Sequence, residues 1–364
     1  MTMMTVSPHA PSRGIALLIV LISITVLSIL AAAFAYSVKV ETKLAQNADA
    51  EAQLLWLGRS GVEYARYVLV QQTTLGGEPF DSLNQKWAGG PGSLAESNSV
   101  LSGISLDNYQ LGDGKFSVKI VDLERRVNIN TAGDPTLQRA LSLMGVDADD
   151  VSVVSDSILD WIDADDDPHV AGAESDYYRS LDPPYVAKSA PIDDLSELLL
   201  VRGVTPAMYW GASSTNHAPA AFRQNKLGFG HSPDQAQDYP FGLVDVFTPI
   251  SSGRVNINTA DVNVLQLLPG VDEPIAEAIV KQRSGPDGVD GTEDDTPFRN
   301  VNASQLAGAG ISSQIASQLE KICATRSVTF EVHVTAEIGD YKREFTAILY
   351  RSRNDVQVLS FFWK

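Results

Sequence analysis

Acidic residues at regular spacing are the first feature of this 364-residue sequence that could perform chemistry. Nine aspartates and no basic residue lie between Asp147 and Asp167. Asp163, Asp165 and Asp167 alternate along the chain, and Glu174 is the twelfth residue counted from Asp163. Hard carboxylate oxygens at this spacing are typical of the loop that surrounds Ca²⁺ in an EF-hand.

The loop departs from an EF-hand at its sixth position. An EF-hand has glycine there, whereas this sequence has Pro168, which cannot adopt a positive φ. The EF-hand backbone is therefore disfavoured. Two interpretations stay open on the residues alone: a calcium loop of a different backbone shape, with Asp176 as a further ligand, and a solvated acidic surface.

A second acidic segment lies at residues 287–295, with five acids and two glycines in nine positions. Clustered carboxylates repel one another unless a cation or open water lies between them. The candidate ligands are Asp287, Asp290, Asp294 and Asp295. A calcium site and a solvated loop are equally consistent with this segment.

No catalytic motif accompanies these acids. The sequence has no Gly-x-Ser-x-Gly, no His-Glu-x-x-His and no complete dinucleotide-binding glycine fingerprint between a strand and a helix. The single cysteine, Cys323, excludes an intrachain disulfide and a multi-cysteine metal site. We expect no enzymatic activity, no catalytic residue and no cofactor other than calcium.

An internal repeat is the second notable feature. Residues 126–132 and 254–260 share the sequence Arg-Val-Asn-Ile-Asn-Thr-Ala, and each copy leads to a Gly-Val-Asp turn. We expect helix–turn–helix units, with Thr131 and Thr259 as helix caps. The phrase resembles competence DNA-uptake proteins, whose helix-hairpin-helix turns hold a DNA phosphate on glycine amides. Here Asp147 and Asp272 occupy the position of the second glycine, and their charge would repel phosphate.

The overall charge agrees with a structural role for these hairpins. The chain has 27 Lys and Arg against 45 Asp and Glu, a net charge of −18. Such a surface repels nucleic acid and forfeits the favourable release of counterions. DNA uptake by a membrane-anchored helix-hairpin-helix protein is therefore the alternative function, and it is not the one we favour.

The N-terminal region predicts a membrane helix. Residues 15–38 are uncharged and apolar, and as a helix they would extend about 36 Å, enough to cross a hydrocarbon core of about 30 Å. Residues 39–75 continue with apolar side chains at three- and four-residue steps, which predicts one long helix that becomes amphipathic. A secretory signal cleaved near Ala33 is the alternative.

Other segments have weaker patterns. Glycine, serine and proline at 76–113 indicate a loop or a poorly ordered connector, and 211–245 read as a linker or an exposed excursion. Residues 133–210 read as helices around the acidic loop. Alternation predicts strands at 114–123, 247–257 and 356–363, and a hairpin of 327–338 with 342–351. We expect the aromatic residues 361–363 in a core, with a partner-binding patch as the alternative.

The N-terminal region also carries a family resemblance. A short leader that ends at Gly14, followed by this helix, resembles type IV pilin-like proteins. In that family a prepilin peptidase cleaves after the glycine, and the new N-terminus, here Ile15, is methylated. Most members have glutamate at the fifth mature position, where this sequence has Ile19. Without that carboxylate a subunit cannot pair with the terminal amine of a neighbour below it, which fits the tip of a fibre.

This departure, the repeat and the Asp-Trp-Ile-Asp-Ala-Asp phrase at 160–165 resemble the minor pseudopilin K family of type II secretion. The resemblance implies an α+β chain: a pilin-like fold with a long N-terminal transmembrane helix on an antiparallel sheet, plus an inserted all-α domain. The implied divisions are a leader (1–14), a transmembrane helix (15–38), its amphipathic continuation (39–75), a connector and first strands (76–132), an inserted helical domain (133–245), and a second Asn-Thr-Ala unit with the closing strands (246–364).

The same resemblance implies a function. It implies a subunit at the tip of the pseudopilus that starts assembly and helps to export folded proteins across the outer membrane. Its expected partners are the minor pseudopilins I and J, the major pseudopilin and the prepilin peptidase. Its expected location is the bacterial inner membrane, with the bulk of the chain in the periplasm. The resemblance also favours Ca²⁺ as the ion that the first acidic loop binds.

Overall fold

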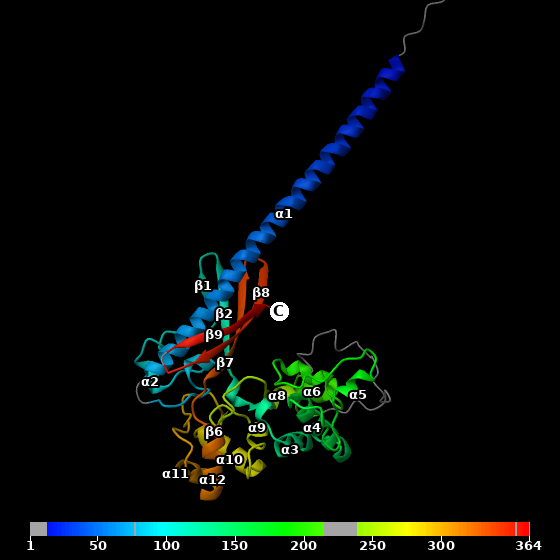
Figure 1. Cartoon of the computed structure of the whole chain (residues 1–364). Coiled ribbons are helices and arrows are strands. Elements are labelled where there is room, and N and C mark those ends of the chain that lie inside the picture. The colour runs from blue at the N-terminus through cyan, green and yellow to red at the C-terminus, as the bar shows by residue number, and fades with distance from the viewer. Residues whose placement is uncertain (1–12, 76–77, 215–238, 354, 364) are drawn as a thin grey trace, which may run out of the picture.

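The computed structural model describes residues 13–75, 78–214, 239–353 and 355–363. Its longest element is α1 (Arg13–Thr74), a single helix of 62 residues that contains no proline. The first half of α1 projects from the molecule, and the second half lies on a β-sheet (Figure 1). The long helix predicted for 15–75 is confirmed, whereas residues 1–12 of the predicted leader lie outside the described residues.

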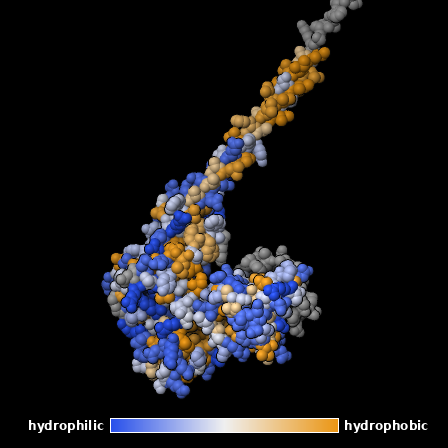
Figure 2. All heavy atoms as spheres, in the orientation of Figure 1, coloured by the Kyte–Doolittle hydropathy of each residue, from blue (hydrophilic) through white to orange (hydrophobic). Residues whose placement is uncertain are grey.

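The projecting half of α1 is apolar on all sides. Its large apolar side chains from Ile15 to Phe34 are each between 49% and 72% exposed. Figure 2 shows this part of the helix as a mostly hydrophobic rod. Within the described ranges, α1 is the one helix that is long and apolar enough to cross a membrane.

One antiparallel sheet of five strands packs against the second half of α1, in the order β1-β2-β7-β8-β9. Its strands are β1 (Tyr109–Leu111), β2 (Gly114–Asp122), β7 (Thr329–Ile338), β8 (Tyr341–Arg351) and β9 (Val356–Trp363). The strand predicted at 114–123, the hairpin and the last strand are confirmed. The central pair, β2 and β7, joins segments more than 200 residues apart in the sequence.

Two glycines of α1 allow the helix to lie close to this sheet. A Cβ at Gly58 would collide with the ring of Phe345, and a Cβ at Gly61 would collide with Val334. The helix and sheet enclose one core, which contains Leu54, Val62, Leu69, Phe116, Val332, Phe345 and Leu349 among others. Burial of this surface fixes the helix on the sheet.

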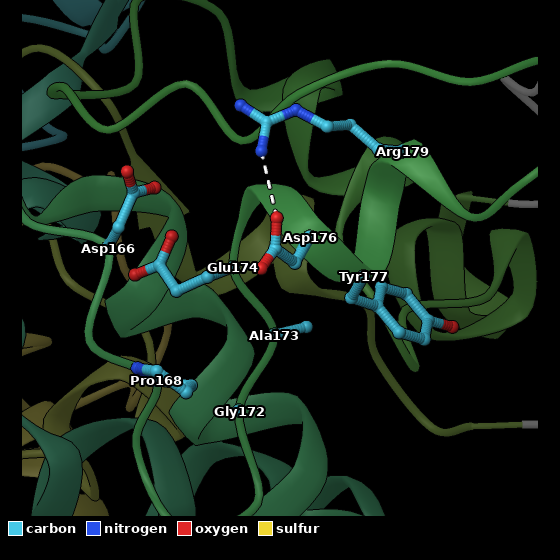
Figure 3. Close-up of a pocket in the computed structure, with 8 residues that line it drawn as sticks. All are labelled: Asp166, Pro168, Gly172, Ala173, Glu174, Asp176, Tyr177 and Arg179. Carbon is cyan, nitrogen blue, oxygen red and sulfur yellow. Dashed lines mark hydrogen bonds and ion pairs between the residues drawn. The ribbon is translucent and has the colours of Figure 1, made fainter.

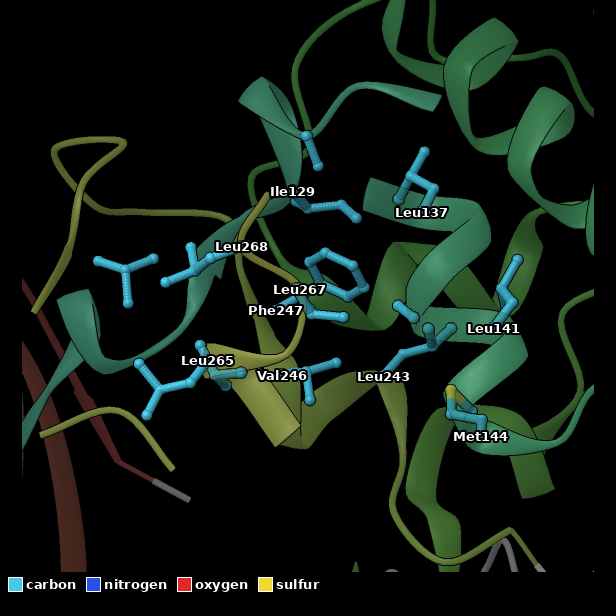
Figure 4. Packing of buried hydrophobic residues seen from close by; sticks show 14 of the residues in the cluster. Ile129, Leu137, Leu141, Met144, Leu243, Val246, Phe247, Leu265, Leu267 and Leu268 are labelled. Carbon is cyan, nitrogen blue, oxygen red and sulfur yellow. The ribbon is translucent and has the colours of Figure 1, made fainter. Parts of the chain in front are cut away.

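A helical domain is inserted between β2 and β7 and lies at the end of the sheet away from the projecting part of α1 (Figure 1). Its α-helices are α3 (Asp134–Met144), α4 (Ala148–Ile162), α5 (Ser175–Arg179), α6 (Pro206–Ser214), α8 (Leu243–Val246), α9 (Val262–Leu265), α10 (Glu273–Arg283), α11 (Ala303–Leu306) and α12 (Ser313–Ile322). A second core runs through it from Ile129 to Cys323, and Phe247 packs at its centre (Figure 4).

The single strand predicted for 247–257 is wrong. The structure has two short strands there, β4 (Phe247–Thr248) and β5 (Val255–Asn256), which pair in parallel with β3 (Val127–Asn128) and β6 (Cys323–Ala324). Pro249 and the turn at Gly253, which has φ 81°, separate them. Apolar alternation persists across this turn, which is why the pattern suggested one strand.

The connector at 76–113 is more ordered than predicted. Its described part includes two short helices, η1 (Lys86–Ala88) and α2 (Leu94–Ser97), as well as β1. Trp87 is 1% exposed and packs edge-on against Phe330, with ring centroids 5.4 Å apart. Of the linker predicted at 211–245, residues 215–238 lie outside the described residues.

The C-terminal aromatic residues do not form core as predicted. Phe362 and Trp363 are exposed, because β9 is the edge strand of the sheet. Phe361 is partly buried and stacks on Phe345. The alternative interpretation, an exposed apolar patch, describes this edge better.

Candidate metal centre

The first acidic loop begins where α4 ends. The buried face of α4 carries Val154, Ile158 and Trp161, and this packing also buries Asp160, which is 0% exposed. Asp163 is the C-cap residue of α4, and Glu174 is the N-cap residue of α5 and is 5% exposed. Two helices anchored in the core therefore hold the two ends of the loop.

Three of the predicted ligands converge. Carboxylate oxygens of Asp163, Asp165 and Glu174 all lie within 4.8 Å of one another. A second group, within the same limit, joins Asp160, Asp163 and His169. The loop thus brings residues of α4, the loop and α5 to one point, as expected for a cation site.

Several oxygens at this point have no hydrogen-bond partner in the part of the chain that the structure describes. They are Asp160 Oδ2, Asp163 Oδ1 and both carboxylate oxygens of Glu174, and all four atoms are buried. Buried charged oxygens are costly unless paired or bound to a metal. Their arrangement fits Ca²⁺, which takes about 6–8 oxygen ligands, backbone carbonyls and waters included.

The electrostatics of the loop agree with this fit. Burial and the nearby charges of Asp160, Asp163 and Asp166 raise the pKa of Glu174 to about 7. Burial, followed by the charges of Asp165 and Asp160, raises the pKa of Asp163. A divalent cation at this point would offset the burial of both carboxylates and relieve the repulsion that adds to its effect.

A small pocket of ≈ 250 Å³ lies beside the cluster. Asp166 and Glu174 point toward one another at its edge, whereas Asp176 turns away to Arg179 (Figure 3). Gly172 lies against Asp160, and a Cβ at this position would collide with Asp160 Oδ2. The loop therefore needs glycine at 172 to approach the buried carboxylate.

Two predicted ligands lie outside the cluster. Asp176 is exposed and forms an ion pair with Arg179 at 2.9 Å. The exposed Asp167 is linked to the loop through its backbone N–H, which donates to Asp165 Oδ1. Spacing alone missed Asp160, Asp166 and His169. Asp160 precedes Asp163 by one helical turn, and that interval was the available signal.

The second acidic loop is arranged differently. Arg283, which is 3% exposed, holds both oxygens of Asp290, with Nε–Oδ1 at 3.1 Å and Nη2–Oδ2 at 2.6 Å. Asp294 accepts from the backbone N–H of Asp287, and Asp295 accepts from that of Gly291. These carboxylates are bound largely by the protein itself, and among the described residues they form no cluster of three within 4.8 Å.

The second asparagine of the repeated Asn-Ile-Asn sequence forms a matching pair of hydrogen bonds in both copies. The backbone N–H of Ile192 donates to Asn130 Oδ1 at 2.7 Å, and Asn130 Nδ2 donates to Ile192 O at 2.9 Å. Asn258 forms the same pair of bonds with the backbone of Phe298, at 2.8 and 2.9 Å. Each copy thus binds the segment that precedes its second turn.

The predicted helix caps at Thr131 and Thr259 are wrong. Gly133 is the N-cap of α3, and Asp261 is the N-cap of α9, where it accepts from Val264 N–H. Thr131 instead donates to Asn128 O, and Thr259 donates to Asp122. The threonines fall within one-turn segments that end before the helices begin.

The turns of the two hairpins carry acids at the starts of helices. Gly145 and Gly270 have φ of 85° and 78°, and each is followed by valine and aspartate. Asp272 is the N-cap residue of α10 and accepts from Ile275 N–H at 3.1 Å. Asp147 is the N-cap residue of α4. A carboxylate therefore lies where a DNA phosphate would be held.

Two segments of the chain match known families. Residues 114–213, from β2 to α6, match the family model described as type II secretion system (T2SS), protein K. The resemblance to the protein K family is confirmed over this segment. Residues 251–293 match a helix-hairpin-helix motif, which corresponds to the second repeat unit.

The fold of the chain agrees with that of a solved structure. The chain is similar to one in the crystal structure of the GspK-GspI-GspJ complex from the type 2 secretion system of enterotoxigenic Escherichia coli. The TM-score is 0.60 and the sequence identity 18%, over 88% of this chain and 99% of the other. A search of curated protein sequences finds no match.

Proposed function

We propose that this chain is a non-enzymatic minor pseudopilin at the tip of a type II secretion pseudopilus. The observation that carries the proposal is the apolar projecting half of α1, joined to a domain that matches protein K. Residues 15–38 would hold the chain in the inner membrane and later in the fibre core, with the bulk of the chain in the periplasm. Prepilin peptidase would cleave between Gly14 and Ile15.

Two features support the tip position. Ile19 supplies no carboxylate for the terminal amine of a subunit below it. The helical domain lies at the end of the molecule opposite the projecting helix, where a further subunit would otherwise stack (Figure 1). From this position the chain would start assembly of the fibre that exports folded proteins across the outer membrane.

The partners we propose are the minor pseudopilins I and J and the major pseudopilin. The similar solved structure is a complex with GspI and GspJ. In this chain the edge strand β9 exposes Leu359, Phe362 and Trp363. Trp56 of α1 is 65% exposed, and Arg59 lies over both its ring and that of Phe361 in β9. Exposed apolar patches of this kind mark protein–protein contacts.

The test is purification of the full chain from membranes in mild detergent. We expect pilin-like subunits to copurify, and mass spectrometry to find a methylated N-terminus at Ile15. Copurification of no pilin-like subunit would reject the tip assignment. An intact Met1, or cleavage after Ala33, would reject the pilin-like class.

We also propose that Asp163, Asp165 and Glu174, with Asp160 behind them, bind Ca²⁺. The buried unpartnered oxygens support this site. Bound calcium would brace the loop between α4 and α5 in a chain that has no disulfide. Calcium in the second loop, at Asp287, Asp290, Asp294 and Asp295, stays a prediction with less support, because Arg283 already neutralises Asp290.

DNA binding is the second candidate function, because residues 251–293 match the helix-hairpin-helix motif. Asp272 at the start of α10 and the net charge of −18 oppose it. A gel shift of the full chain with duplex DNA at low salt separates the two functions. Binding that weakens steeply with added salt would favour DNA uptake over the pseudopilin function.

A further inference from the structure

A pocket lined by three arginines lies at the end of the sheet, away from the acidic loops in sequence. Its volume is ≈ 420 Å³. It is bounded by the last turn of α1, the segment that leads into β7, and the end of β8. The residues that line it are Thr73, Arg326, Ser327, Val328, Tyr350, Arg351, Ser352 and Arg353.

Arg351 forms the base of this arginine pocket and is 3% exposed. Its Nη2 pairs with Asp81 and donates to Ser327 O, and its guanidinium lies 4.8 Å from the ring centroid of Phe330. Its Nη1 is buried and has no hydrogen-bond partner in the described part of the chain. A buried guanidinium donor without an acceptor is costly, so an acceptor is expected to complete it.

Arg326 and Arg353 add charge that the protein does not balance. Among the described residues neither forms an ion pair, although acids outnumber bases in the chain by 45 to 27. Burial and the charge of Arg351 lower the pKa of Arg326, whereas Asp81 raises it. Arg351 is paired with Asp81, which leaves Arg326 and Arg353 as the two arginines of the pocket without an ion pair among the described residues. The buried carboxylates of Asp122 and Glu124 lie behind the pocket wall, where they accept from the Ser327 hydroxyl and from the backbone N–H of Val328.

The serine and threonine hydroxyl groups that line the pocket are already used as donors. Thr73 donates to Val70 O, Ser352 to Asp355 O and Ser327 to Asp122. Recognition in the arginine pocket therefore depends on guanidinium groups, whose planar donors suit the oxygens of phosphate and carboxylate. The two arginines without an ion pair favour a dianion over a monoanion.

We propose that the arginine pocket binds a doubly charged oxyanion of the phosphate class. A headgroup of the membrane that holds the chain cannot be the source, because Thr73 lies 35 residues beyond Val38, about 50 Å along a straight helix. The ligand is therefore a free phosphate or a soluble phosphomonoester. This inference does not depend on the pseudopilin function.

The test titrates the full chain in detergent micelles with inorganic phosphate at constant ionic strength. Calorimetry measures the binding, and thermal melting measures its effect on stability. We expect saturable binding and a rise in the melting temperature. Arg326→Gln and Arg353→Gln, both at exposed positions, should each weaken binding about tenfold, the loss of one charge-assisted hydrogen bond. Lys119→Gln removes a charge from an exposed position of β2 and should leave binding unchanged.

Three results would overturn the proposal. The first is a titration with no saturation. The second is phosphate binding that is equally tight in Arg326→Gln, Arg353→Gln and Lys119→Gln. That result would mean that phosphate responds to the overall charge of the protein and not to this pocket. The third is acetate binding as tight as phosphate binding, because the pocket would then not select phosphate over a carboxylate. A parallel titration with glycerol phosphate, which is a phosphomonoester, distinguishes that class of ligand from free phosphate.

Discussion

Asp122, the last residue of β2, accepts a hydrogen bond at 2.6 Å from the hydroxyl of Thr259, which belongs to the second Asn-Thr-Ala unit. The same oxygen, Oδ2, also accepts from Asn256 at 3.1 Å and from Ser327 at 2.7 Å. One buried carboxylate therefore joins the pilin-like sheet, the repeat unit and the segment that returns to the sheet. The relative position of sheet and helical domain depends on this junction.

Replacement of Asp122 by alanine should destabilise the chain by about 3 kcal/mol or more, because three buried donors would lose their acceptor. The measurement is the denaturant midpoint of the full chain in micelles, followed by tryptophan fluorescence. Asp107→Ala, at an exposed position before β1, is the control and should leave the midpoint unchanged. Equal midpoints for the two variants would show that the junction contributes little.

The neighbouring Glu124 predicts a dependence of stability on pH. Burial and the charge of Asp122 raise its pKa to about 7 from an ordinary value of 4.5. The folded chain therefore keeps a proton that the unfolded chain releases at lower pH. This contribution to stability is complete below pH 4.5 and is lost as the pH rises through 7.

Melting temperatures between pH 4.5 and 7.5, at saturating calcium, test this prediction. Glu124→Gln should show a smaller fall with rising pH than the unsubstituted chain, because it lacks the titrating group. Glu344→Gln, at a position that is 61% exposed in its side chain, should keep the full dependence. If the melting temperature of Glu124→Gln falls with pH as steeply as that of the unsubstituted chain, other groups cause the pH dependence.

Features that repeat along the chain were predictable from the sequence. The apolar run predicted α1, and alternation predicted β2, the β7–β8 hairpin and β9. Spacing also found Asp163, Asp165 and Glu174. Each of these signals is local, because helix and strand periods appear within a few turns or residues.

Contacts between distant segments were not predictable. Asp81, Asp122 and Arg351 meet at one junction although they are far apart in sequence, and nothing in their local sequence marks them. Asp160 was also missed, since it reads as an ordinary helical residue. The wrong strand at 247–257 has the same origin: apolar alternation does not report that each half pairs with a different distant strand.

The two asparagine clamps predict matched losses of stability. Asn258→Ala removes both hydrogen bonds to Phe298, and Asn130→Ala removes those to Ile192 and one to Pro249. Each should cost about 1–3 kcal/mol, with the larger loss at Asn258 because its amide is fully buried. Asn98→Ala, at an exposed position after α2, is the control in the same denaturation measurement. A larger loss at Asn130 than at Asn258 would contradict this ranking.

Calcium should raise the melting temperature of the full chain through the first acidic loop. An ion present at about 100 times its dissociation constant stabilises by about 2.7 kcal/mol, which corresponds to a few degrees for a chain of this size. Glu174→Gln and Asp163→Asn should abolish the difference between calcium and chelator, because they remove oxygens of the cluster. Asp176→Asn removes an acid from the same loop region that is paired with Arg179 outside the cluster, so it should keep the full difference. If Asp176→Asn and Glu174→Gln reduce the difference equally, calcium acts as a general counterion of the acidic surface and not as the ligand of a defined site.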